Sequence, residues 1–125
     1  MRRLLIVAAQ CALLVSAPCA TFDVDGDLMR GIDDTAKSLD SDVAQKDARA
    51  AAADARALVD TFGRIESHYG EKPKTADAAG FAHRTQELAA QALQAIEASD
   101  FDAAGDAVAR LTRSCRNCHE VYKKD

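Results

Sequence analysis

Residues 46–69 read KDARAAAADARALVDTFGRIESHY, and this stretch decides the fold class. Its apolar residues recur at alternating steps of three and four, which is the period of one face of an α-helix. Good helix formers, alanine above all, fill most positions between them, and no proline interrupts the run. The stretch therefore predicts one long helix with a continuous buried seam of Ala48, Ala51, Ala55, Leu58, Phe62, Ile65 and Tyr69.

The same period recurs on both sides of this stretch. One helix is predicted over 24–43, and a break that contains Pro73 separates the central helix from a third one over 76–98. Ser99 or Asp100 is expected to cap a fourth helix. The predicted inward residues are Leu28 or Met29, Ile32, Ala36, Leu39 and Val43 in the first helix, Phe81, Leu88, Ala92, Leu93 and Ile96 in the third, and Ala104, Val108, Leu111, Cys115, Cys118 and Tyr122 in the fourth.

Four helices of about twenty residues, joined by short breaks, favour antiparallel neighbours. The expected fold class is all-α, as an antiparallel up-down-up-down four-helix bundle. Periodicity alone also admits an alanine-rich coiled-coil hairpin or a helical adaptor that binds no cofactor.

The first twenty residues have the three parts of a secretory signal peptide. A positively charged start is followed by an apolar run from Leu4 to Val15 and by a stretch of mostly small residues. The apolar run is too short to span a bilayer as a helix. We expect cleavage after Cys19 or Ala20, which removes residues 1–20 and leaves 21–125 as one domain. A lipid anchor on Cys19 is the alternative, and the proline before it argues against that reading.

The charge balance argues against two classes of partner. The whole chain has a net charge of −4, and loss of the signal peptide with its two arginines lowers the charge to −6. A chain this acidic is a poor match for nucleic acid or for an anionic membrane surface. No segment after the signal peptide is apolar enough for membrane insertion, so neither partner is expected.

Residues 115–119 read CRNCH and carry the chemistry, because the other two cysteines leave with the signal peptide. Cys115 and Cys118 share one face of a helix, and His119 lies one turn after Cys115. Two thiols in this arrangement can form thioether bonds to the vinyl groups of one haem, and the imidazole can then reach the iron. A porphyrin would also add volume to a core that has no tryptophan. The motif predicts one covalently bound haem c.

Three other interpretations of these cysteines fit less well. A structural zinc ion prefers four ligands, and the chain adds only His68 and His83 to the motif. A thioredoxin-like redox pair expects a βαβ context, and a disulfide between residues three apart on a helix is strained and closes a trivial loop. A helical module with zinc or a disulfide in place of haem is the alternative that these interpretations leave.

The motif and its position near the C-terminus also carry a family resemblance. Residues 115–123, CRNCHEVYK, are similar to the ending of the class II c-type cytochromes, cytochrome c-prime and cytochrome c-556. In that ending, two residues, an aromatic and a base follow CxxCH. The resemblance covers nearly all of 21–125 and implies a four-helix bundle that forms homodimers in many members. A secreted chain with a c-type haem points to the bacterial periplasm.

The second axial ligand of the iron decides the function. Met29 is the one methionine outside the signal peptide and the start codon, and bundle topology places it at the same end as the motif. The segment Leu28-Met29-Arg30 also resembles the Leu-Met-basic segment of the methionine-ligated branch of the family. His119 and Met29 are therefore the expected ligand pair of an electron-transfer cytochrome, which serves redox partner proteins and is not an enzyme.

Other arrangements on the distal side stay open. Met29 can be a core side chain that fills space. If Leu28 faces the iron instead, the resemblance to cytochrome c-prime implies a five-coordinate binder of nitric oxide or carbon monoxide. His68 is a weaker ligand candidate that suits the C-terminal end of its helix, and His83 is expected at the surface or rim.

Basic residues crowd the helix that carries the motif. Between Arg110 and Lys124 there are five basic residues and one acidic residue. Part of this charge suits a helix C-terminus. The family resemblance implies Lys123 as the partner of a haem propionate, and the remaining charge fits a docking face for an acidic redox partner.

Overall fold

The computed structural model describes residues 21–122, so the predicted signal peptide and Lys123 lie outside the described residues. Within that range the chain forms four long helices and one short 3-10 helix, with no strand. The prediction of an all-α four-helix bundle is confirmed. The elements are α1 (Gly26–Gln45), α2 (Ala48–Gly70), η1 (Pro73–Thr75), α3 (Ala76–Glu97) and α4 (Phe101–Tyr122).

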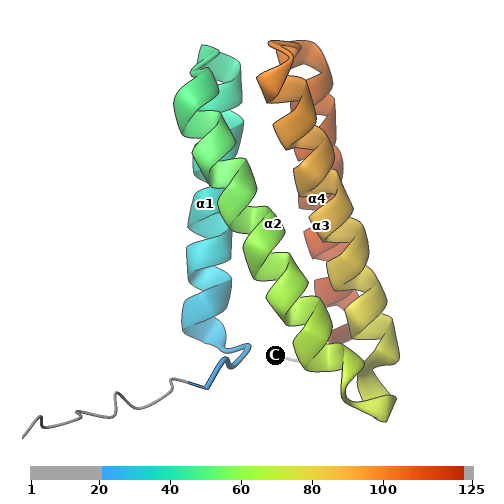
Figure 1. Cartoon of the computed structure of the whole chain (residues 1–125). Coiled ribbons are helices and arrows are strands. Elements are labelled where there is room, and N and C mark those ends of the chain that lie inside the picture. Colours follow the sequence, from blue (N-terminus) through green and yellow to red (C-terminus); the bar gives the residue numbers. More distant parts are fainter. Residues whose placement is uncertain (1–20, 123–125) are drawn as a thin grey trace, which may run out of the picture.

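Consecutive helices run in opposite directions, so the start of α1 and the end of α4 lie at the same end of the bundle (Figure 1). Helix α2 crosses obliquely, beside α1 at its start and beside α3 at its end (Figure 1). Among neighbouring helices, contacts are most extensive between α2 and α3 and sparsest between α1 and α4. Helix α1 is therefore the least tightly held of the four.

The turns after α1 and after α3 are built in the same way. Lys46 directly follows α1 and Ser99 lies two residues after α3, and each has a φ of 58°, in the left-handed region, which ends the preceding helix. The next residue, Asp47 or Asp100, caps the following helix, because its carboxylate accepts a hydrogen bond from the amide three residues on. Of the two predicted caps of the fourth helix, Ser99 and Asp100, the structure thus shows Asp100.

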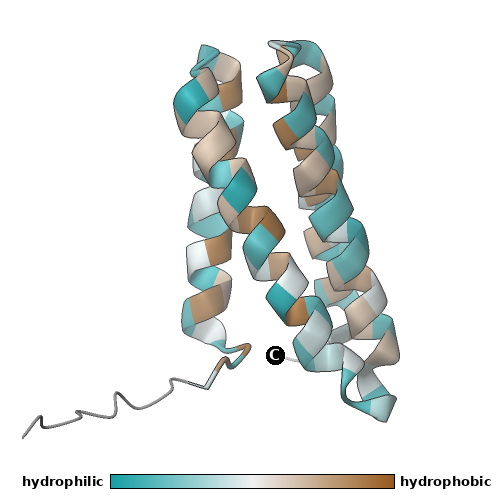
Figure 2. Cartoon of the chain, viewed as in Figure 1, coloured by the Kyte–Doolittle hydropathy of each residue, from teal (hydrophilic) through white to brown (hydrophobic). Residues whose placement is uncertain are grey.

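The core lies where the predicted seams of α1, α2 and α4 meet, and its largest fully buried side chains include Leu39, Leu58 and Leu111. Ala48 departs from the prediction: it is exposed because it begins α2, beyond the reach of α1. Each helix shows hydrophilic and hydrophobic residues in alternation along its length (Figure 2), as expected for a bundle.

The buried face of α3 agrees with the predicted one at Ala92 and Ile96 and differs from it at the other three positions. Phe81, Leu88 and Leu93 are only partly buried, and a neighbouring row of smaller residues faces the centre. Small side chains allow α2 and α3 to approach closely, so the larger ones flank the contact instead of filling it. The buried row of α3 is Ala78, Ala82, Thr85, Ala89, Ala92 and Ile96.

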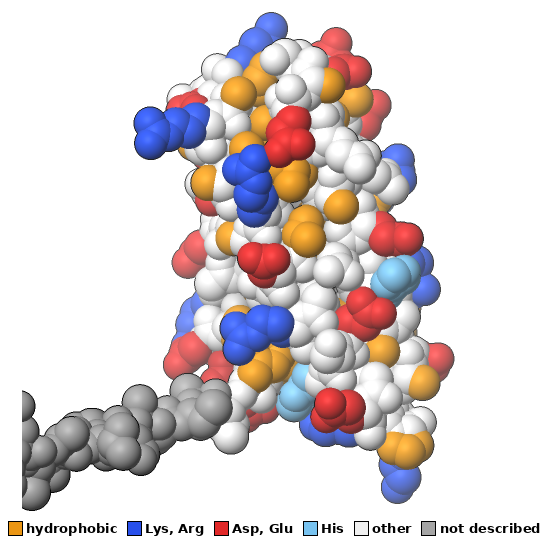
Figure 3. All heavy atoms as spheres, viewed as in Figure 1, with side chains coloured by type: hydrophobic (Ala, Val, Ile, Leu, Met, Phe, Trp, Pro, Cys, Tyr) orange, Lys and Arg blue, Asp and Glu red, His pale blue; other side chains and the backbone are white. Residues whose placement is uncertain are grey.

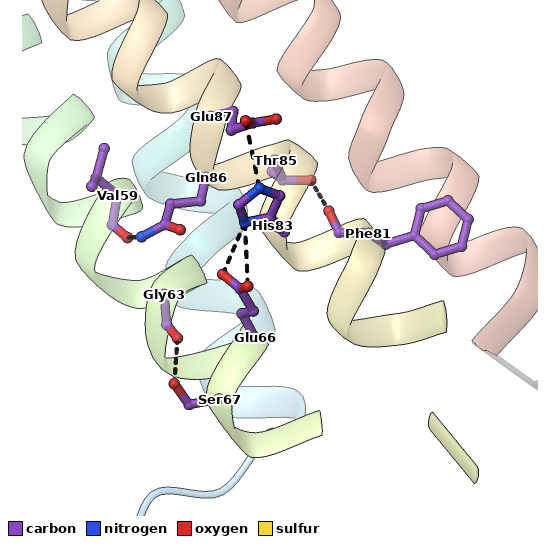
Figure 4. Close-up of polar contacts among 9 residues, drawn as sticks. All are labelled: Val59, Gly63, Glu66, Ser67, Phe81, His83, Thr85, Gln86 and Glu87. Carbon is purple, nitrogen blue, oxygen red and sulfur yellow. Dashed lines mark hydrogen bonds and ion pairs between the residues drawn. The ribbon is translucent and has the colours of Figure 1, made fainter. Parts of the chain in front are cut away.

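Polar groups on the outer side of the α2–α3 contact tie the two helices together. Gln86 Nε2 donates to the Val59 carbonyl at 3.2 Å, and a Cβ on Gly63 would lie 2.7 Å from that nitrogen. His83 bridges the Glu66 carboxylate at 3.2 Å and Glu87 at 3.5 Å (Figure 4). Glycine at position 63 thus leaves room for a side-chain-to-backbone bond between the helices.

Acidic and basic side chains are interspersed over the face seen in Figure 3, with apolar atoms exposed between them. Within residues 21–122, no helix is both long and apolar enough to cross a membrane.

Candidate functional site

A cavity of about 700 Å³ opens between the helices at the end of the bundle where α1 begins and α4 ends. Its volume lies within the roughly 300–1,000 Å³ of sites that hold organic ligands and cofactors. Most of its lining is apolar, and every helix contributes. The apolar lining residues outside α4 are Val24, Met29, Ile32, Ala36, Phe62, Ile65, Tyr69, Ala78, Phe81 and Ala82.

Helix α4 brings the predicted motif to this cavity. Cys115, Cys118 and His119 all line it, together with Thr112 and Tyr122. Both cysteines are half-buried free thiols, and His119 is exposed at the edge. The spacing of the motif on one helical face therefore places two nucleophilic sulfurs and an imidazole against one apolar cavity.

Helix α1 brings Met29 to the same cavity. Met29 lines it, is partly buried and packs against the core. Leu28 packs against the core as well but is not among the lining residues. Of the two neighbours, the thioether side chain is thus the one that faces the space shared with His119.

The carboxylates and the guanidinium among the described lining residues all come from the start of α1 and its cap. Asp25, Arg30 and Asp33 line the cavity, and Arg30 forms an ion pair with Asp27. Arg30 is the one Lys or Arg among the described lining residues. A ligand with carboxylates would find its nearest cation there.

Burial changes the acidity of the groups around the motif. Burial raises the pKa of the Cys115 thiol, and the neighbouring Cys118 adds to the effect. Burial also raises the pKa of Cys118, which the Arg84 guanidinium partly opposes. Burial raises the pKa of Tyr69 as well, with a further contribution from Cys118. Both thiols are therefore held in the protonated form at neutral pH.

A buried pair of hydroxyls joins α3 to α4 directly beside the motif. The Thr85 Oγ1 donates to the Phe81 carbonyl at 2.8 Å (Figure 4) and lies 2.6 Å from the Ser114 Oγ. A hydroxyl has one proton, so Ser114 is the donor to Thr85. Thr85 lines the cavity and Ser114 precedes Cys115, so this pair fixes the last turns of α4 against α3.

A family model described as Cytochrome C' matches residues 20–123. The chain belongs to the cytochrome C' family. No curated protein and no solved structure matches the chain significantly.

The residues at the cavity fit haem c, the group that proteins of the cytochrome C' family bind. The donor set is the one that a c-type haem requires: two free thiols three residues apart and an imidazole at the next position. The thioether of Met29 is a soft ligand that also suits iron. The apolar lining suits the porphyrin, whose carboxylates would lie near the polar rim.

The two remaining histidines of the sequence analysis do not line the cavity. His68 and His83 are not among its lining residues; His83 is exposed beside Glu66, and His68 packs between Phe22 and Tyr69. Lys123 lies outside the described residues, so its role with a propionate stays a prediction.

Sequence reasoning missed two features of this cytochrome C' family site. The hydrogen bond between Thr85 and Ser114 could have been predicted, because both residues occupy the apolar period of their helices and a buried hydroxyl needs a hydrogen-bond partner. Phe22 precedes the first helix, where periodicity has no bearing, and yet it packs against the core. Phe22 lies three residues before the capping Asp25, outside the position that a hydrophobic staple would occupy, so no local sequence signal indicates this contact.

The raised thiol pKa values predict how the stability of the haem-free protein depends on pH. A thiol whose pKa is higher in the folded than in the unfolded protein stabilises the fold. This contribution is complete below the unfolded pKa of about 8.5, and it is lost as the pH rises through the folded pKa. Urea unfolding under reducing conditions should therefore show a lower unfolding free energy at about pH 9.5 than at about pH 7.5. The Cys115→Ser, Cys118→Ser variant is the matched control, and an undiminished pH effect in it would assign the loss to other groups.

Proposed function

We propose that this member of the cytochrome C' family is a periplasmic electron-transfer cytochrome with one covalently bound haem c. Cys115 and Cys118 would form the two thioether links, and His119 and Met29 would be the axial ligands. The observation that carries the proposal is that Met29 and the CxxCH residues line one cavity although more than eighty residues separate them in sequence.

Each residue has a separate role in this proposal. Haem iron, when bound, supplies a one-electron Fe(III)/Fe(II) couple whose potential methionine ligation raises. The two cysteines hold the cofactor to α4, and the apolar side chains of Ile32, Phe62 and Ile65 keep water from it. The Thr85–Ser114 hydrogen bond fixes the helix that carries the anchors.

The surroundings of the cavity suit exchange of electrons with a protein partner. His119 is exposed, and Tyr122 and Val121 near it are exposed apolar residues, at 38% and 56% of their surface. A redox partner can thus approach the motif without any substrate entering the cavity. This fits an electron carrier that is not an enzyme, secreted by the predicted signal peptide at 1–20.

A second candidate is a five-coordinate binder of nitric oxide or carbon monoxide. Membership of the cytochrome C' family favours it, because five-coordinate gas binding is typical of that family. It requires that Met29 line the cavity without ligating iron. The two candidate functions therefore differ in whether the Met29 sulfur is bonded to the haem iron.

The Met29→Ala variant of the haem-loaded protein tests the proposal. Loss of a thioether ligand should remove the weak long-wavelength band of methionine-bound Fe(III) and lower the reduction potential by on the order of 0.1 V, within the roughly 0.8 V that axial ligands control. Optical spectroscopy and redox titration measure the two effects.

Leu28→Ala is the matched control for this variant. Leu28 is adjacent, partly buried and packed against the same core, but it does not line the cavity. Its replacement should leave the band and the potential in place. If Met29→Ala also leaves both unchanged, the electron-transfer proposal fails and the gas-binding candidate takes its place.

A further inference from the structure

Phe22 lies just before α1 and is held by two side chains of α2. The guanidinium carbon of Arg64 lies 4.1 Å from the centre of the Phe22 ring, and the His68 ring meets it edge-on at 6.0 Å between centroids. Arg64 and His68 are four residues apart, so both project from one face of α2. We call these three residues the Phe22 clamp.

The clamp is itself supported on the α2 side. The His68 ring also packs edge-on against Tyr69 at 5.2 Å, and its Nε2 lies 2.9 Å from the Lys72 Nζ. Tyr69 lines the cavity. The seat of Phe22 on α2 is therefore linked to the candidate haem site through His68 and Tyr69, and Phe22 also packs against the core.

Asp23, Val24 and Asp25 connect Phe22 to the first turn of α1. Val24 packs against the core and lines the cavity, and Asp25 caps the helix. The Asp25 carboxylate accepts from the Leu28 amide at 2.9 Å, and its carbonyl accepts from the Met29 amide at 3.1 Å. The backbone of Met29 is thus hydrogen-bonded to a cap whose preceding residues are fixed by Phe22.

The clamp acts where the bundle is least tightly packed. Helix α1 contacts its neighbours less extensively than α2, α3 and α4 contact one another along the chain. The first residues of a domain are poorly ordered unless something ties them down. Phe22 supplies that tie for the turn that carries Met29.

We propose that Phe22 is a positioning residue, which holds the start of α1 against α2 and so keeps the Met29 side chain in the cavity. The proposal rests on the proposed function in one respect, namely that Met29 ligates the haem iron. Two states are then in equilibrium: one with Met29 in place, and one in which the start of α1 has moved away and the distal side accepts a small gas. The clamp sets the balance between them.

The Phe22→Ala variant tests the proposal in the reduced, haem-loaded protein with carbon monoxide as the probe. Loss of the ring removes one cation–π and one aromatic contact, so the open state should become about tenfold more populated, a change of about 1.4 kcal/mol. Stopped-flow measurement should show about tenfold faster carbon monoxide association. The Phe22→Tyr variant keeps the ring and should restore the slow rate.

Phe101→Ala is the matched control, because Phe101 is a phenylalanine that is also partly buried and packed against the core, but it lies at the start of α4, at the other end of the bundle. Hydrogen exchange of residues 21–32 gives a second readout that does not depend on the haem. It should become faster in Phe22→Ala and not in Phe101→Ala. Equal rates of carbon monoxide association in these two variants would overturn the proposal.

The Phe22→Ala, Met29→Ala double variant separates this inference from the proposed function. If the clamp acts through Met29, removal of Phe22 should add nothing to the carbon monoxide rate once Met29 is absent. A further acceleration in the double variant would overturn the positioning role and leave methionine ligation intact. If Met29→Ala alone changes neither rate nor spectrum, the proposed function fails and the inference falls with it.

Discussion

Replacement of both Cys115 and Cys118 by alanine is expected to abolish covalent retention of haem. The two half-buried thiols line the cavity and are the only cysteines within residues 21–122, so no other described side chain can form a thioether bond. After extraction with acidified acetone, the pyridine haemochrome spectrum of the wild-type protein should persist in the protein fraction. That of the double variant should be found entirely in the solvent.

Single variants and a neighbouring control sharpen this experiment. Cys115→Ala and Cys118→Ala should each retain haem through one bond, in reduced yield. Ser114→Ala removes a buried hydroxyl one residue before the motif and should keep both bonds, although it loosens the contact with Thr85. Complete extraction of haem from the wild-type protein would contradict covalent attachment and favour the zinc or disulfide alternative.

The second large effect is expected in stability. Leu111 has no exposed surface, and it lies one helical turn before Cys115. Leu111→Ala should cost about 2–5 kcal/mol, because it removes buried methyl groups and leaves a cavity that α1 to α3 fill only in part. A domain of this size has roughly 5–15 kcal/mol of total stability, so the loss is a large fraction of it.

Urea unfolding of the haem-free protein measures this cost without a contribution from the cofactor. Val121→Ala on the same helix is the control, since Val121 is 56% exposed and its truncation should stay within about 0.5 kcal/mol. Leu111→Ala is also expected to lower the melting temperature of the protein by more than about 10 °C. A Leu111→Ala protein as stable as Val121→Ala would show that the cavity end of α4 is not packed as described.

The parts of this protein that the sequence predicted are those in which one residue type dictates one geometry. The seam of α2 and the face shared by Cys115 and Cys118 follow from the helical period, and the break at Pro73 follows from the missing amide proton of proline. Bundle topology then brought Met29 to the same cavity as His119, as expected. Periodicity and connectivity were sufficient for these features.

The face of α3 could not be predicted in the same way, and the reason is physical. The helical period predicts Phe81, Leu88 and Leu93 as buried together with Ala92 and Ile96, but the close approach of α2 selects the smaller row that includes Ala82 and Ala89. Which of two adjacent rows is buried depends on the partner helix, and the period of α3 carries no information about that.

The seat of Phe22 escaped prediction for a different reason. It depends on Arg64 and His68, which lie on an exposed and on a partly buried position of α2, far along the chain. His68 was interpreted through its own helix end alone. A contact between a residue outside a helix and the side of another helix leaves no periodic trace in the sequence.

The paired turns at Lys46 and Ser99 have a consequence for how the cofactor can be installed. Both tight turns lie at the end of the bundle remote from the cavity, so each half of the protein is a helical hairpin whose contacts are local and form quickly. The cavity, by contrast, needs residues of α1 and α4 from opposite ends of the chain, and such distant contacts form late. We therefore expect the contacts between consecutive helices to form first, with the attachment cysteines accessible to the haem until α1 and α4 come together.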